Sequence, residues 1–139
     1  MPRRAKSTAV PRSEARLFLA KAAQYLIDCE GAAEGNRHDT VMLTAIHAGI
    51  SAADAVAVAL AGLRSTDHDH HRTIELLEQV AGSSAGVKRH AGQLRELVAR
   101  KNIVEYESRR ATAREAADAL RRASRLVAWA RETVDRARV

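Results

Sequence analysis

The placement of proline most constrains how this chain can fold. Its two prolines, Pro2 and Pro11, both lie near the N-terminus. Proline cannot donate the backbone hydrogen bond that the interior of an α-helix needs, so the rest of the chain is open to long helices. Alanine and leucine are abundant, and only 3% of the residues are aromatic. This composition favours an all-α protein, and 139 residues suit one domain with its own core.

Apolar residues recur at helical spacing in four long segments and one short one. In the last segment, for example, Leu120, Val127 and Val134 lie on one helix face. Short loops join the segments, and we therefore predict an antiparallel up-and-down helical bundle. The helices are expected at about residues 13–30, 40–63, 67–81, 87–100 and 112–139.

Residues that favour helix N-termini precede several of these segments. Asp39 or Thr40 suits the start of the second helix, because a short polar side chain can accept a hydrogen bond from a free backbone amide. Thr112 and Glu115 have the spacing of a capping box, in which a hydroxyl and a carboxylate each bind one free amide. These signals predict where two helices begin.

The N-terminal segment differs in charge from the rest of the chain. Residues 1–12 contain Arg3, Arg4, Lys6 and Arg12 and no acidic residue. We predict that they form a flexible basic arm and that residues 13–139 form the bundle. The whole chain has a net charge of +6, which favours acidic partners such as nucleic acid.

The single cysteine, Cys29, excludes an internal disulfide and fits a reducing cytoplasm. No apolar run comes near the ~20 residues that a membrane-spanning helix requires. The basic start of the chain lacks the hydrophobic segment of a signal peptide. We therefore expect a cytoplasmic protein without a membrane partner.

The helical pattern of the fourth segment fails at Arg100 and Lys101. Leu94, Leu97 and Val98 form one apolar face, and a continued helix would direct Lys101 into the core. An unpaired buried ammonium is costly. Either the helix breaks near Arg100, or Lys101 reaches a polar cleft between helices.

Three polar residues share a face of the second predicted helix. His47, Ser51 and Asp54 are spaced at i, i+4 and i+7, beside the apolar stripe. One interpretation is a satisfied His47–Asp54 pair in the core, together with a surface pair between Lys101 and Glu105. The other is a polar cleft that these residues form with the basic residues at 100–101.

A basic residue followed by asparagine, with a histidine four to six residues later, is the motif of HEPN domains. These are small all-helical bundles, and many are metal-independent endoribonucleases. This chain resembles that family: Arg100 or Lys101 matches the basic residue, Asn102 the polar residue, and Tyr106 stands where the histidine is expected. The resemblance extends to residues 45–54 and covers roughly residues 13–134. The tyrosine weakens the implied catalysis and leaves the implied HEPN-like bundle unaffected.

The resemblance implies RNA cleavage by transesterification, which needs a base for the 2′-hydroxyl and a cation for charge on phosphorus. Arg100 or Lys101 would supply the cation. His47 is the best substitute base, because the phenol of Tyr106 keeps its proton at neutral pH. The expected nucleic-acid or nucleotide contacts are Arg100, Lys101, Asn102, Ser51 and Asp54.

Two further features have more than one interpretation. The run from Asp67 to His71 alternates acids and histidines, but adjacent ligands diverge on a helix, so Asp67 or Asp69 is better explained as an N-cap than as a metal ligand. Trp129 lies among arginines such as Arg125, a combination typical of interfaces and of base-stacking surfaces. HEPN proteins are commonly dimers, so we expect Trp129 and Arg125 in a dimer interface; the other interpretation is a tryptophan at the rim.

These observations leave two functions of different classes. The first is a HEPN-like RNA- or nucleotide-binding protein with weakened endoribonuclease activity, the toxin-like half of a toxin–antitoxin type system. Its partner would be an antitoxin or a nucleotidyltransferase. The alternative is a catalytically silent dimeric helical interaction module. We expect neither a cofactor nor a metal in either case.

Overall fold

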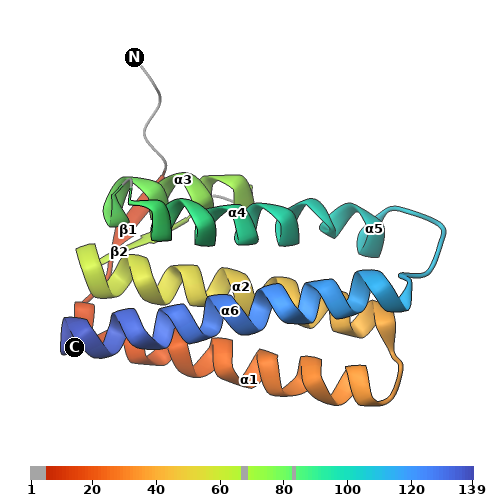
Figure 1. Cartoon of the computed structure of the whole chain (residues 1–139). Coiled ribbons are helices and arrows are strands. Elements are labelled where there is room, and N and C mark those ends of the chain that lie inside the picture. The colour runs from red at the N-terminus through yellow and green to blue at the C-terminus, as the bar shows by residue number, and fades with distance from the viewer. Residues whose placement is uncertain (1–5, 67–68, 83) are drawn as a thin grey trace.

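The computed structural model describes residues 6–66, 69–82 and 84–139, and it confirms the predicted all-α class (Figure 1). The predicted segments all form helices, and a short helix follows the fourth. The bounds are α1 (Ala15–Glu34), α2 (His38–Ala61), α3 (His70–Ala81), α4 (Ala85–Ala99), α5 (Lys101–Glu105) and α6 (Ala113–Ala137).

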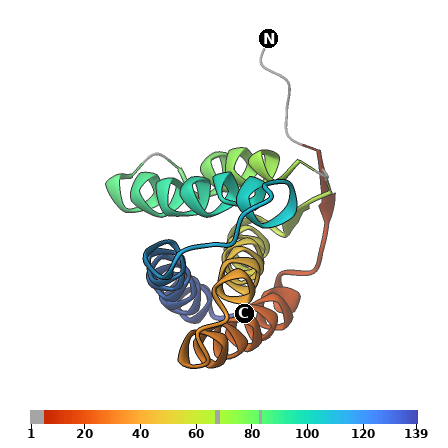
Figure 2. The same cartoon turned by 90° about the vertical axis from the view of Figure 1, so that its right-hand side faces the viewer.

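Helix α2 lies at the centre of the bundle, with α1 and α6 on one side and α3 and α4 on the other (Figure 2). Every residue from 52 to 59 is buried, which explains why α2 is apolar nearly all round. At Gly49 the helices approach closely, because a Cβ there would lie 2.9 Å from Cδ1 of Leu97 and 3.3 Å from Cδ1 of Leu126. Small residues on α2 therefore set how closely the bundle packs.

Among the described helices, α2 has the length and apolar composition of a membrane-spanning helix. Its most apolar window has a mean hydropathy of 1.6, and 72% of that window is buried inside the bundle. The helix is not an uninterrupted apolar run, because polar residues such as His47 and Asp54 lie within it. Such burial is typical of the core helix of a helical bundle.

The helix directions differ from a strict up-and-down alternation. Helices α1 and α2 run antiparallel, as do α3 and α4, but α2 and α3 point the same way (Figure 1). After α2 the chain passes through strand β2 (Leu63–Ser65) and returns along the bundle before α3 begins. The predicted alternation fails because it assumed a short turn between these two helices.

Strand β1 (Ser7–Ala9) pairs antiparallel with β2, with Thr8 opposite Arg64. A one-turn 3₁₀ helix, η1 (Arg12–Glu14), then leads into α1. Arg12 donates from Nε to the carbonyl oxygen of Ala59 at 2.7 Å. This part of the predicted flexible arm is therefore attached to the bundle, while residues 1–5 lie outside the described residues. Three-residue strands are too short to show an alternating pattern in the sequence.

Candidate functional site

The helix break predicted near Arg100 is present. Helix α4 ends at Ala99 and α5 begins at Lys101, with Arg100 between them at φ −78° and ψ −8°. Its backbone amide donates a hydrogen bond to the carbonyl oxygen of Leu97, three residues back. In an α-helix the acceptor would lie four residues back. About a third of the Lys101 side chain is exposed, so its ammonium avoids the core.

A cavity of about 220 Å³ opens between this break and the start of α3. Three predicted site residues, Lys101, Asn102 and Tyr106, line it together with two histidines that precede them by about 30 positions. The structure thus gathers an ammonium, an amide, a phenol and imidazoles. The lining residues are Asp69, His70, His71, Val98, Ala99, Lys101, Asn102 and Tyr106.

His70 is the residue of this cavity that the sequence reasoning missed as a site residue. Burial lowers the pKa of its imidazole below the ordinary value, and the nearby charges of Lys101 and His47 lower it further. A histidine with a lowered pKa is neutral at physiological pH, so it can accept a proton. The signal in the sequence was that His70 belongs to the run of acids and histidines at residues 67–71, which predicted only an N-cap or a metal site.

His47, the predicted substitute base, lies outside the lining of this cavity. It is exposed, and its ring stacks on Tyr25 of α1 with the ring centroids 5.3 Å apart. Its charge acts on His70. His47 is therefore close enough to the cavity to influence its chemistry, although it is not one of the lining residues.

Lys101 and Asp69 also make the contacts that their simpler interpretations predict. Lys101 Nζ lies 3.8 Å from a carboxylate oxygen of Glu105 in the next turn. Asp69 caps α3 and accepts a hydrogen bond from the backbone amide of His71 at 3.0 Å. Within the described ranges no cluster of three or more metal-ligating side chains is found. Asp67 and His68 lie outside the described residues.

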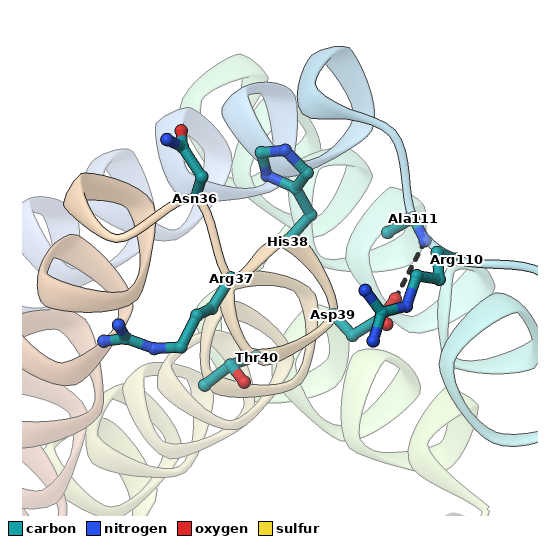
Figure 3. A pocket seen from close by; sticks show the side chains of 7 residues that line it. All are labelled: Asn36, Arg37, His38, Asp39, Thr40, Arg110 and Ala111. Carbon is teal, nitrogen blue, oxygen red and sulfur yellow. Dashed lines mark hydrogen bonds between the residues drawn. The ribbon is translucent and has the colours of Figure 1, made fainter.

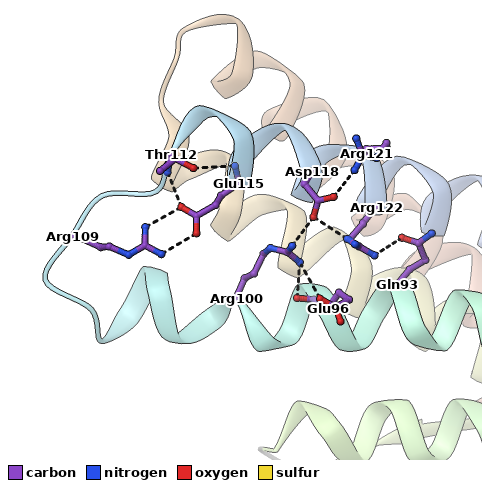
Figure 4. A network of polar contacts seen from close by, with 9 residues as sticks. All are labelled: Gln93, Glu96, Arg100, Arg109, Thr112, Glu115, Asp118, Arg121 and Arg122. Atoms are coloured by element: carbon purple, nitrogen blue, oxygen red, sulfur yellow. Dashed lines mark hydrogen bonds and ion pairs between the residues drawn. The ribbon is translucent and has the colours of Figure 1, made fainter.

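Arg100 does not line the cavity. Its guanidinium lies 2.6 Å from a carboxylate oxygen of Asp118 on α6, where Arg121 and Arg122 also bind (Figure 4). Burial raises the pKa of Asp118, but the hydrogen bond from Arg122 and the charge of Arg100 outweigh it, so the pKa is lowered overall. Arg100 therefore links α4 to α6, and Lys101 is the motif cation that reaches the cavity.

Asp54 and Ser51 lie further along α2. Asp54 is only 7% exposed, and its carboxylate lies 3.7 Å from Nε of Arg64 in β2. The Arg64 guanidinium in turn sits over the ring of Phe18. Burial raises the pKa of Asp54 to about 6 despite the charge of Arg64. The partner of Asp54 is thus Arg64 rather than His47, and Ser51 lies half-buried between the two sites.

Trp129 is half-buried and stacks on His90 of α4, with the ring centroids 4.4 Å apart and the planes 11° apart. The pair lines a cavity of about 490 Å³ that also includes Arg89 and Arg125. One face of the indole is therefore already covered within the chain. Its place in a dimer interface, with Arg125, stays a prediction.

A third cavity, of about 310 Å³, lies at the start of α2 (Figure 3). Asp39 accepts a hydrogen bond from the backbone amide of Ala111 at 2.8 Å. The prediction that Asp39 or Thr40 caps α2 was wrong, because α2 begins at His38 after Arg37 and no described side chain caps it. Asp39 instead holds the segment before α6 against α2. Thr112 begins α6 with the predicted capping box.

A scan against protein-family models gives no match to this chain, and no curated protein matches its sequence.

Proposed function

We propose that this chain is a HEPN-like RNA-binding protein with weak, metal-independent endoribonuclease activity. The observation that carries the proposal is that His70, Lys101, Asn102 and Tyr106 line one open cavity. The net charge of +6 supports an anionic ligand. The resemblance of residues 100–106 to the HEPN motif supports RNA as that ligand and a toxin–antitoxin type partner.

The chemistry would use the groups of the cavity in distinct roles. The ammonium of Lys101 would bind a non-bridging phosphate oxygen and stabilise the charge that develops on it. A neutral imidazole at His70 would accept the 2′-hydroxyl proton as that oxygen attacks phosphorus. Asn102 and Tyr106 would donate hydrogen bonds that orient the phosphate. The 5′-oxygen would then leave and take a proton from solvent.

One observation favours the alternative, a catalytically silent dimeric interaction module. The arginine that best matches the HEPN cation, Arg100, is held by Asp118 with its side chain only 20% exposed. A guanidinium committed to a carboxylate is less available for phosphate. If the module interpretation holds, the cavity binds RNA weakly or not at all and the polar groups are structural.

The test is RNA cleavage and binding by the pure protein in the presence of a chelator. We expect Lys101→Ala to weaken binding of a mixed-sequence single-stranded RNA, and His70→Ala to abolish any residual cleavage, typically by about 10²-fold or more. Tyr106→His should raise cleavage, since an imidazole titrates near neutral pH. Lys88→Ala is the matched control, because Lys88 is exposed and lies at the opposite end of α4.

If Lys101→Ala, Lys88→Ala and the parent bind the RNA with equal affinity, the cavity takes no part in RNA recognition. If the parent is inactive and the folded Tyr106→His variant is inactive too, the protein binds RNA without cleaving it. No binding at low salt would favour the interaction module.

A further inference from the structure

The outer face of α1 carries apolar side chains where a bundle helix normally presents charge. Leu17 is 62% exposed and Ile27 is 67% exposed, and both point away from the core face that contains Phe18 and Cys29. Figures 1 and 2 show α1 at the edge of the bundle, with helices on one side of it only. Two large apolar residues on the outward face of one helix are not explained by the fold.

These residues belong to a continuous uncharged strip along α1. Its members follow one another at alternating spacings of three and four, the repeat of a helix seam that packs against another helix. All are exposed, and a Cβ added at Gly31 would meet only open space. By the helix rise, the strip is about 21 Å long. The α1 outer strip consists of Leu17, Ala20, Gln24, Ile27 and Gly31.

Charges of opposite sign flank the two halves of the α1 outer strip. Lys21 follows Ala20 and Asp28 follows Ile27, so both lie on the same edge of the strip, one on each side of its middle. A hollow of about 250 Å³ separates them and is lined by Lys21, Gln24, Tyr25 and Asp28. The strip is therefore basic on one half of that edge and acidic on the other.

We propose that the α1 outer strip is a self-association surface on which a second copy of this chain packs with its α1 antiparallel to the first. A twofold axis through the middle of the strip places Lys21 of each copy against Asp28 of the other. Leu17 then faces Gly31 and Ala20 faces Ile27, so each large apolar side chain meets a small residue and the two helices can approach closely. A parallel twofold would instead bring this edge of one strip against the opposite edge of the other, so Lys21 and Asp28 would not meet. This inference is independent of RNA binding.

The experiment is sedimentation equilibrium of the full chain at ~0.15 M salt. We expect the parent to form dimers and Ile27→Asp to be monomeric. Lys21→Glu and Asp28→Lys should each weaken the dimer by about tenfold or more, because each creates two like-charge contacts. These two variants change the net charge in opposite directions, so a shared loss cannot come from overall charge.

Restoration of the pairing gives the sharpest readout. The double variant Lys21→Glu/Asp28→Lys should dimerise like the parent. An equimolar mixture of the two single variants should form a heterodimer, since both cross-chain pairs are again of opposite sign. That result also shows that each single variant is folded.

Three outcomes would overturn the proposal. The first is a parent that stays monomeric at high concentration. The second is a dimer that persists in the Ile27→Asp variant and is lost in the Trp129→Ala variant, which would place the contact on α6. The third is a double variant and a mixture that both remain monomeric, which would exclude the antiparallel pairing of Lys21 with Asp28.

Discussion

At the scale of single residues, Asp54 is the most buried of the described carboxylates. It is buried on α2, and burial raises its pKa from an ordinary value of 3.8 to about 6 even though Arg64 is nearby. A folded-state pKa above the unfolded value means that the folded protein holds the proton more tightly. The stability that this proton provides is present at low pH and is lost as the pH rises through about 6.

Replacement of Asp54 by asparagine should therefore stabilise the protein at pH 7. The free energy of unfolding is expected to rise by about 1–3 kcal/mol, the upper figure being the pKa shift converted at 1.36 kcal/mol per unit. The gain should shrink towards zero near pH 4, where the parent carboxyl is protonated. Urea unfolding of parent and variant at both pH values measures this, with exposed Glu30→Gln as the control. A gain that is equal at both pH values would mean that ionisation of Asp54 is not its cause.

At the scale of elements, the break between α4 and α5 separates two neighbouring cations. Arg100, on the α4 side, ion-pairs with Asp118 of α6, while Lys101, on the α5 side, lines the cavity. In the sequence, Arg100 and Lys101 belong to the same HEPN-like motif, and either residue could be its cation. Arg100 therefore makes a structural contact, whereas Lys101 faces the cavity.

This division predicts that Arg100→Ala acts on stability more than on RNA binding. The free energy of unfolding should fall by about 1–2 kcal/mol, since the lost hydrogen bonds to a charged group are largely shielded from water. Arg95→Ala is the matched control on α4, because its ion pair with Glu78 is about half exposed and should cost less than about 1 kcal/mol. Urea unfolding gives both values. If Arg100→Ala instead leaves stability unchanged and abolishes RNA binding, Arg100 is the cation of the site.

At the scale of the whole molecule, charge determines how the chain meets a polyanion. The net charge of +6 acts at a distance and without sequence specificity. Salt screens this attraction. When lysine and arginine side chains bind phosphates, counterions leave the RNA, and a high salt concentration opposes that release.

We expect the parent to bind single-stranded RNA at low salt and to release it as the salt concentration rises. A plot of log affinity against log salt should be linear, with a slope of about −0.7 for each phosphate contact. Fluorescence anisotropy from ~50 to ~300 mM salt measures the slope. Affinity that is constant over this range would rule out an electrostatic mode of binding.

The local features of this protein could be predicted from its sequence. The helix positions followed from apolar periodicity, the α6 start from Thr112 and Glu115, and the break from the cations at 100–101. Each of these depends on residues within a few positions of one another, so the pattern is complete in the chain. On the same basis Asp67 or Asp69 was predicted to cap α3, and Asp69 does so.

Which of these features lie in contact depends on how the helices pack. His70 joins Lys101, Arg100 joins Asp118, and Asp54 joins Arg64, because α2 lies at the centre and the chain returns along the bundle before α3. The sequence pattern shows which face of a helix is apolar but not which neighbour covers it. That choice depends on how the small residues of α2, such as Gly49, let the surrounding helices close together, and packing of this kind is a property of the whole fold.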